Sequence, residues 1–372
     1  MLEADRLHGD LIGAPDGRDR LNTPALVLDL DALDANIAAM ADWARGQGVA
    51  LRPHAKTHKS GEIGRRQIAA GAVGLCCAKL GEAEALAADG IGSILLTSPV
   101  VTPMGIARLV ALNETMAELA VVADYPDAVA AIAAANAGKP LRVLVDVDPG
   151  VHRTGVASAE AAVALARAIV AAPSLVWGGV QFYCGSQQHI PAFADRRTAI
   201  TDRTAYLETV LAALRDAGFD PPVVTGGGTG THRIDAELGV LTELQVGSYV
   251  FMDREYADCD LGTNFATALA VDTRVISANT AGMATLDAGL KALATEAGPP
   301  RFLAGVAEGA SYRFMGDEQG AVIGPDVPAL GSRVTLMTPH CDPTVNLYDA
   351  YHVVRGEELV AIWPVTARGR SA

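Results

Sequence analysis

The sequence is short of positive charge. Its 29 Lys and Arg residues are outnumbered by 43 Asp and Glu, which gives a formal net charge of -14 at pH 7. A surface of this sign repels phosphate backbones and anionic lipid head groups. Nucleic acid and membrane surfaces are therefore excluded as expected partners, and a small molecule is favoured.

Long apolar runs and paired cysteines are also missing. No stretch is apolar for long enough to cross a bilayer, and residues 1–20 mix acidic and basic side chains in a way unlike a secretion signal. Five cysteines, an odd number without a CxxC pair, predict neither a disulfide framework nor a structural zinc site. We expect a cytoplasmic protein with buried thiols on strands, namely Cys76, Cys77, Cys184 and Cys259.

The order of apolar runs predicts an α/β protein. A chain of 372 residues is long enough for two domains. From Val49 onward, short β-rich runs alternate with Ala-rich helical stretches, which is typical of a parallel sheet covered by helices. Eight strands and their helices favour a closed (β/α)8 TIM barrel over an open sheet, because closure removes exposed edges. The expected strands cover residues 50–55, 73–78, 93–98, 119–123, 141–148, 176–183, 222–226 and 243–252.

The two ends of the chain do not follow this alternation of strands and helices. Residues 23–29 predict one further strand, and Asp31 is expected to cap a helix over residues 32–47. After about residue 266, strands at 268–276, 333–337, 351–354 and 359–363 follow one another across turns, which indicates an antiparallel β domain. We therefore divide the chain into an N-terminal segment, 1–25, that packs on the β domain, a barrel, 26–265, and a C-terminal mainly antiparallel β domain, 266–372.

Reactive side chains gather at the expected strand ends, where a barrel holds its active site. Lys56 follows the first strand within Arg52-Pro-His-Ala-Lys-Thr-His-Lys59, and its cationic neighbours are expected to depress its pKa so that the amine can form an imine. The seventh strand ends in Gly226-Gly-Gly-Thr-Gly230, a turn whose backbone N–H groups can bind a phosphate. A reactive lysine opposite a phosphate loop predicts pyridoxal 5'-phosphate (PLP).

A second ligand pair stands near the C-terminus. His340 and Asp342 are two residues apart, so on an extended segment both point to one side while Cys341 points away. A nitrogen and a hard oxygen suit Mn2+, Mg2+ or Co2+, with substrate and water as further ligands. If Cys341 were a ligand instead, Zn2+ would be favoured.

These motifs resemble the D-threonine aldolase and D-serine dehydratase family, which has the alanine racemase-like fold of PLP enzymes, fold type III. The resemblance covers most of the chain in eight ordered matches. They are Thr23-Pro-Ala-Leu-Val-Leu-Asp29, the Lys56 segment, Asp146-Val-Asp-Pro-Gly-Val-His-Arg153-Thr-Gly155, Gln181-Phe-Tyr-Cys-Gly185 with Gln188-His189, the glycine turn, Leu244-Gln-Val-Gly-Ser-Tyr249, Asp287-Ala-Gly-Leu-Lys291 and His340-Cys-Asp342.

The resemblance implies a role for each site residue. Lys56 is the Schiff-base lysine, and Arg153 and Tyr183 bind the cofactor, Arg153 near its ring. His340 and Asp342 bind the divalent ion, with Mn2+ expected first, and the protein is expected to be a homodimer. The phosphate is held by Gly227, Gly228, Thr229, Ser248 and Tyr249.

The metal motif separates two activities. Dehydratases of the family tend to show a histidine followed two positions later by cysteine, whereas D-threonine aldolases show His-Cys-Asp, as this chain does. The resemblance thus implies a carbon–carbon lyase that cleaves D-threonine-like D-β-hydroxy-α-amino acids to glycine and an aldehyde, with His189 as the base at the β-hydroxyl. One departure, Asp317-Glu-Gln-Gly320 where many relatives have Glu-His-Gly, leaves the pocket for the β-substituent undefined.

Four alternatives remain at this point. A 3-hydroxy-D-aspartate aldolase would release glyoxylate, and a dehydratase of D-serine or 3-hydroxy-D-aspartate would release ammonia and a keto acid. A non-catalytic PLP carrier would have no reason for the β domain and the metal pair. A metal-dependent barrel hydrolase without PLP would be colourless.

Overall fold

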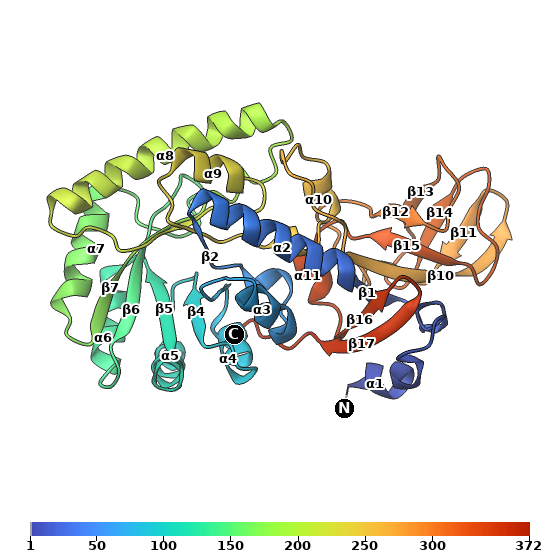
Figure 1. The fold of residues 1–372 in the computed structure, drawn as a ribbon, viewed down its shortest axis with the longest axis horizontal. Helices are drawn as coiled ribbons and strands as arrows, with labels where there is room; N and C mark the ends of the chain where they lie inside the picture. The colour runs from blue at the N-terminus through green and yellow to red at the C-terminus, as the bar shows by residue number, and fades with distance from the viewer. Residues whose placement is uncertain (1) are drawn as a thin grey trace.

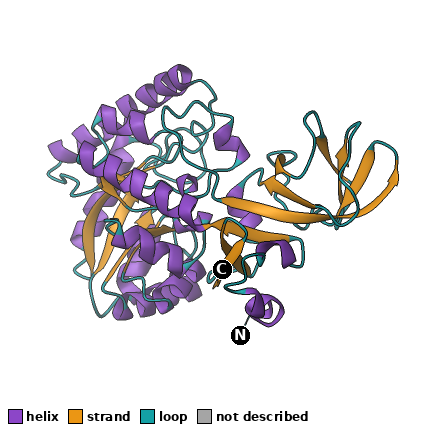
Figure 2. Ribbon diagram, turned by 45° about the vertical axis from the view of Figure 1, so that its right-hand side comes forward, coloured by secondary structure: helices purple, strands orange, loops and turns teal. Residues whose placement is uncertain are grey.

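The computed structural model describes residues 2–372, which form two domains of unequal size. Figure 1 shows a larger body in which helices surround a set of strands, and a smaller body built mainly of strands. Figure 2 shows the same division by colour, with most of the helices on the larger body. None of the helices in residues 2–372 is long and apolar enough to cross a membrane.

The larger domain contains the expected eight-stranded parallel sheet, in the order β2-β9-β8-β7-β6-β5-β4-β3. Its two end strands meet, because His54 bridges Cys76 and the Cys76 N–H donates to the Pro53 carbonyl at 2.8 Å. The sheet therefore closes into a barrel, as predicted. The strands are β2 (Ala50–Leu51), β3 (Leu75–Cys77), β4 (Ser93–Leu96), β5 (Glu118–Ala123), β6 (Leu141–Asp146), β7 (Leu175–Phe182), β8 (Val224–Gly226) and β9 (Glu243–Leu244).

The helices that cover the barrel alternate with its strands. They are α2 (Leu30–Gln47), α3 (Gly61–Ala69), α4 (Leu80–Ala88), α5 (Pro103–Thr115), α6 (Pro126–Ala135), α7 (Ala159–Ala171), α8 (Phe193–Asp216) and α9 (His232–Leu238), followed by the short α10 (Arg254–Ala257). The cap expected at Asp31 is wrong: Asp29 accepts from the Ala32 N–H and starts α2.

Six of the eight barrel strands are shorter than the sequence predicts, and two of them, β2 and β9, end four or more residues early. The first barrel strand ends at Leu51, and Lys56 lies in the single helical turn η3 (Ala55–Thr57). The eighth ends at Leu244, and residues within the predicted 243–252 run form the turn η4 (Ser248–Val250) instead. In both places the chain leaves the sheet just before the residues of the predicted site.

The second domain is a nine-stranded, mainly antiparallel sheet that draws on both ends of the chain. Its strand β1 (Ala25–Asp29) pairs antiparallel with β10 and parallel with β16, so the strand predicted at 23–29 lies in this sheet while α2, which follows it, covers the barrel. The others are β10 (Leu269–Thr280), β11 (Met283–Leu286), β12 (Arg301–Ala304), β13 (Ser311–Phe314), β14 (Gly320–Ile323), β15 (Arg333–Met337), β16 (Ala350–Arg355) and β17 (Glu358–Pro364), with the short helix α11 (Cys341–Val345) after β15.

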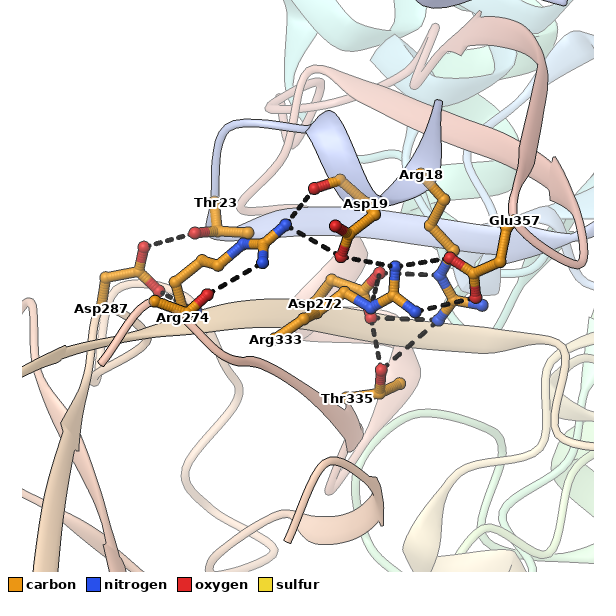
Figure 3. Close-up of polar contacts among 10 residues, drawn as sticks. Arg18, Asp19, Thr23, Asp272, Arg274, Asp287, Arg333, Thr335 and Glu357 are labelled. Carbon is orange, nitrogen blue, oxygen red and sulfur yellow. Dashed lines mark hydrogen bonds and ion pairs between the residues drawn. The ribbon is translucent and has the colours of Figure 1, made fainter. Parts of the chain in front are cut away.

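The segment before β1 contains α1 (Glu3–His8) and the turns η1 (Gly9–Leu11) and η2 (Arg18–Arg20). Arginine–carboxylate pairs join it to the second sheet (Figure 3). Arg18 donates from Nε and Nη2 to the fully buried Asp272 at 2.8 and 3.0 Å, and Arg274 donates to Asp19. Two-pronged contacts to a buried carboxylate fix position as well as charge.

All five cysteines are free. Cys76 and Cys77 are buried on β3, as predicted. Cys184 is buried but lies two residues past the end of β7, so its expected place on a strand is wrong. Cys259 follows α10, is only partly buried and does not lie on a strand, so the prediction for that residue is wrong.

Candidate active site

A cavity of about 210 Å³ opens at the carboxyl ends of the barrel strands. The positions of Lys56, Arg153 and Tyr183, which the sequence predicts as cofactor-binding, are all on its wall. The Arg153 guanidinium lies over the Tyr183 ring at 5.7 Å from its centroid. The lining is completed by His54, Ala78, Thr97, Ser98, Thr154, Gln181 and Gln245.

Lys56 faces a carboxylate from the other domain. Its Nζ lies 3.3 Å from Oδ2 of Asp342, and the lysine side chain is 39% exposed. The Asp342 charge outweighs burial and raises the pKa of Lys56 above its ordinary value, so the depressed pKa expected from the sequence is wrong.

The cations that flank Lys56 in sequence do not act on it as expected. Burial lowers the pKa of His54 and brings that of His58 to about 4, so both imidazoles are neutral at pH 7. The Lys59 ammonium is paired with the buried Glu82 at 3.1 Å. A cluster that looks strongly positive in the sequence is thus largely neutralised in space.

The glycine loop after β8 is shaped by close contacts. A Cβ on Gly228 would lie 2.6 Å from Oε1 of Gln188, and one on Gly230 would lie 2.0 Å from the Gln188 carbonyl oxygen. Gly227 has a φ of 67°, a conformation that L side chains rarely adopt. Only glycine fits at these positions.

The loop leaves donors free for an anion. Within residues 2–372 the N–H groups of Gly227, Thr229 and Ser248 make no hydrogen bond. Tyr249 braces the arrangement, because its N–H donates to the Thr229 hydroxyl at 3.0 Å and its own hydroxyl accepts from the Gln67 amide at 3.1 Å. Free backbone N–H groups at a glycine turn fit a phosphate.

The turn of Lys56 packs against the segment that contacts the glycine loop. Gly247 precedes η4, and a Cβ there would lie 2.7 Å from the Thr57 hydroxyl, which is next to Lys56. The segment that carries Ser248 is therefore packed directly against the turn that carries Lys56.

The predicted metal pair has a different backbone from the one expected. His340 is the N-cap of α11, so Asp342 lies in the first turn of a helix and not on an extended segment. Cys341 is fully buried, and its N–H donates to Asp253 at 2.8 Å. Burial opposes the charge of Asp342, but Lys56 and His340 outweigh it and lower the pKa of the carboxyl to about 2.

His340 has carboxylates on one side. Its Nδ1 lies 2.8 Å from Oε1 of Glu296 and 3.5 Å from Oε2 of Glu255. Burial disfavours the imidazolium, but Asp342 and Asp253 outweigh burial and raise the pKa of His340. Nowhere in residues 2–372 do three His, Cys, Asp or Glu side chains gather as a metal-binding group, so His340 and Asp342 could supply two ligands of an ion and no more.

His189 lies on the loop after β7, next to the Gln188 that supports the glycine loop. Its ring packs on Tyr256 with centroids 4.4 Å apart. Burial lowers the pKa of His189, and its buried Nε2 has no partner among the described residues. A neutral imidazole with one free nitrogen can accept a proton.

Sequence reasoning assigned no role to the glutamines of the site. Gln188 donates to the Cys184 carbonyl and the Thr231 hydroxyl and accepts from the Gly230 N–H, so it holds the loop. Gln181 and Gln245 line the cavity. The sequence did contain a signal for Gln181, which is an amide near the end of the otherwise apolar strand β7.

The segment 317–320, which the sequence left without a defined role, makes exposed ion pairs with Lys291 and does not line this cavity.

Two family models match the chain. The alanine racemase N-terminal domain matches residues 28–255, and the putative serine dehydratase domain matches residues 268–354. The first match spans the barrel and the second falls on the strands of the second domain.

Similar proteins match the chain over nearly all of its length. A 3-hydroxy-D-aspartate aldolase from Paracoccus denitrificans (strain Pd 1222) is 39% identical over 362 residues, covering 94% of this chain and 93% of the relative. A D-threonine aldolase from Arthrobacter sp is 39% identical over 359 residues, covering 95% and 94%. The crystal structure of D-threonine aldolase from Filomicrobium marinum superposes with a TM-score of 0.92 at 37% identity, covering 95% of this chain and 97% of that one.

Proposed function

We propose that this chain, which belongs to the family that joins an alanine racemase N-terminal domain to a serine dehydratase domain, cleaves D-β-hydroxy-α-amino acids to glycine and an aldehyde with the help of PLP and a divalent cation. The chain is an enzyme, a carbon–carbon lyase like the aldolases it resembles. The observation that carries the proposal is that Lys56 lies on the wall of a cavity, 3.3 Å from Asp342, in a turn packed against the segment that carries the free Ser248 N–H.

The residues present fit PLP. Lys56 would hold the aldehyde carbon, the N–H groups of the glycine loop would hold the phosphate, and Arg153 with Tyr183 would flank the ring. When bound, this cofactor takes up the electron pair of a bond broken at the α-carbon. The part left to the protein is to orient the substrate, to exclude water and to move protons.

His340 and Asp342 would hold the divalent cation. The Asp342 carboxylate is ionised, and the Nδ1 of His340 is turned to Glu296, so Nε2 is the nitrogen left for an ion. A nitrogen and a hard oxygen suit Mn2+ first, with Mg2+, Co2+ or Zn2+ as alternatives. An ion there would lower the pKa of a ligated substrate hydroxyl.

His189 is proposed to take the proton from the β-hydroxyl. Its neutral state at pH 7 and its unpartnered Nε2 suit a base.

The test is product identity. The protein is loaded with PLP and incubated with D-threonine, D-serine and D-3-hydroxyaspartate, with and without Mn2+. Glycine together with an aldehyde, dependent on Mn2+, is the expected result. Borohydride reduction and peptide mapping should place a pyridoxyl label on Lys56, and a label elsewhere or none at all would defeat the proposal.

Two neighbouring activities are separated by the same assay. Preference for D-3-hydroxyaspartate, with glyoxylate as the aldehyde, would assign the chain as a 3-hydroxy-D-aspartate aldolase; the exposed Arg153 guanidinium at the cavity is a cation that could hold the second carboxylate. Ammonia and a keto acid would instead assign a dehydratase, an activity that the serine dehydratase match keeps open.

The resemblance also supports a homodimer, which sedimentation equilibrium would test. Five free cysteines agree with a reducing, cytoplasmic setting. Neither nucleic acid nor membrane is proposed as a partner, because the net charge of -14 disfavours both.

A further inference from the structure

A chain of hydrogen bonds among three buried side chains, one carboxyl and two amides, runs from the barrel interior to the cavity. Asp146 at the end of β6 accepts from Nε2 of Gln181 at 2.9 Å, and Oε1 of Gln181 accepts from Nε2 of Gln245 at 3.2 Å. All three residues are buried, with at most 4% of their surface exposed. Only the two glutamines reach the cavity wall.

The direction of this chain is fixed by its surroundings. The second N–H of the Gln181 amide donates to the Thr97 carbonyl at 3.1 Å. A backbone carbonyl accepts and never donates, so a Gln181 amide turned by 180° would set its oxygen against the Thr97 and Asp146 oxygens. This orientation of the Gln181 amide does not depend on the charge of Asp146, although burial raises the pKa of that carboxyl to about 6.

The orientation of the Gln181 amide fixes that of the Gln245 amide. Because the Gln181 oxygen faces it, Gln245 must present its NH2 group to Gln181, and its second N–H donates to the Thr225 hydroxyl at 3.1 Å. Both donors of the Gln245 amide are then used. Its carbonyl oxygen is the atom left over, and no donor within residues 2–372 reaches it.

We propose that Gln245 presents this oxygen to the cavity as a fixed acceptor and takes a hydrogen bond from the ring N–H of the bound pyridine cofactor, which holds the ring nitrogen in its protonated form. Gln181 acts as the positioning residue that sets the direction of the Gln245 amide. The inference rests on the proposed function, since it needs PLP in this cavity. A lone pair on an unprotonated ring nitrogen would face the lone pairs of the Gln245 oxygen, whereas a protonated one is stabilised.

The position of Gln245 in the chain agrees with this role. It stands just before Gly247 and Ser248, whose segment supplies a free N–H for the phosphate and packs against the turn of Lys56. A protonated ring nitrogen draws electrons more strongly, so Gln245 would strengthen the cofactor as an acceptor of the electron pair.

The experiment measures the ring nitrogen itself. The holoprotein is prepared with PLP labelled with 15N in the ring, and the 15N chemical shift is followed between pH 6 and 9. The wild type is expected to show a protonated nitrogen at pH 7.5. Gln245→Leu should lower the pKa of that nitrogen by about 1 to 2, the size of a hydrogen bond to a charged group. Gln245→Glu should keep the nitrogen protonated.

Matched variants distinguish the role of the Gln245 oxygen from that of the side chains that hold the Gln245 amide. Thr225→Val removes one acceptor of the Gln245 amide but keeps the Gln181 contact, so the 15N shift should not change. Gln181→Leu releases the amide and should lower the pKa of the ring nitrogen. An unprotonated ring nitrogen in the wild type, or a Gln245→Leu spectrum equal to it, overturns the proposal even if Lys56 carries the cofactor. Absence of both the visible band and the borohydride label on Lys56 overturns the proposed function and this inference together.

Discussion

At the scale of single residues, His189 is the side chain whose replacement tells most about the chemistry. His189→Asn keeps a polar side chain but removes the basic nitrogen, so kcat for cleavage should fall by about 10²- to 10⁴-fold, the usual contribution of a general base. The visible band of bound PLP should be unchanged, because His189 is not among the residues proposed to hold the cofactor. Steady-state kinetics and absorbance on the same preparation test both statements.

His152 offers the matched control for that variant. Its side chain is 83% exposed, and its φ of 59° is a conformation that asparagine tolerates. His152→Asn should therefore keep full activity. Full activity of His189→Asn would remove His189 from the mechanism, and loss of the PLP band would give it a structural role instead.

Asp342 is the residue at which the metal proposal can be tested. Chelation by EDTA, and separately Asp342→Asn, should each lower the cleavage rate by about 10²-fold or more, because the ion lowers the pKa of the substrate hydroxyl. Bound Mn2+, counted by its EPR signal, should be lost in both cases. Asp317→Asn is the control, since that carboxylate is exposed and, within residues 2–372, pairs only with Lys291. Cleavage that survives complete metal removal would rule out the ion as a participant.

Lys56 and Asp342 show what a sequence can and cannot predict for a single residue. The proposal of Lys56 as the reactive lysine follows from its place after a strand and opposite a glycine loop. Its state of charge does not, because the charge that controls it, Asp342, comes from the other domain. The local sequence also predicts that His54 and His58 are cations, whereas burial makes both neutral.

At the scale of elements, a pair of buried histidines holds α1 to β16. The Asn22 N–H donates to Nε2 of His8 at 3.0 Å, so His8 must carry its proton on Nδ1, which lies 2.8 Å from Nε2 of His352. His352 in turn donates from Nδ1 to the Leu26 carbonyl. Every hydrogen bond is satisfied with both rings neutral, and a second proton on either ring has no acceptor.

This arrangement predicts an acid-sensitive N-terminal segment. Burial lowers the pKa of His8, and burial followed by the charge of His8 lowers that of His352 to about 4 against an ordinary 6.5, while Asp272 opposes this. The stabilisation is therefore complete above pH 6.5 and is lost as the pH falls toward 4, by about 3 kcal/mol for His352. The protection factors of residues 3–22, which correct exchange rates for the pH dependence of intrinsic amide exchange, should fall between pH 7 and 5, and His8→Gln should flatten that dependence. Equal protection at both pH values would contradict it.

Elements differ in how far the sequence predicts them. The barrel strands were predictable because a parallel sheet buried on both faces needs continuous apolar runs, as in β5 and β6. The four strands β11 to β14 have only four residues each, and β11 pairs with β14 and β12 with β15 across a long stretch of sequence, which local pattern does not contain. The His340-Cys-Asp342 segment was expected to be extended, but Pro343 stands in the first turn of α11, a position that favours a helix.

At the scale of the whole molecule, the two domains share a hydrophobic core. One cluster of buried side chains joins α2 and the end of the barrel sheet to the second sheet. Phe251, fully buried after η4, packs on Tyr351 of β16 with ring centroids 5.9 Å apart, and the Tyr351 hydroxyl donates to the His58 carbonyl. The site depends on this junction, because Lys56 lies on one side of it and Asp342 on the other.

A shared core predicts that the two domains unfold together. Leu165 of α7 is 1% exposed and belongs to the cluster that packs the covering helices on the barrel strands, away from the second sheet. Leu165→Ala should lower the free energy of unfolding by about 2 to 5 kcal/mol. In urea titrations of two background variants, one keeping only Trp177 of β7 and the other only Trp363 of β17, the midpoint should move equally for both indoles. If Leu165→Ala shifts the Trp177 transition and leaves that of Trp363 in place, the domains are independent, and the pairing of Lys56 with Asp342 would then depend on weak docking of two separately stable bodies.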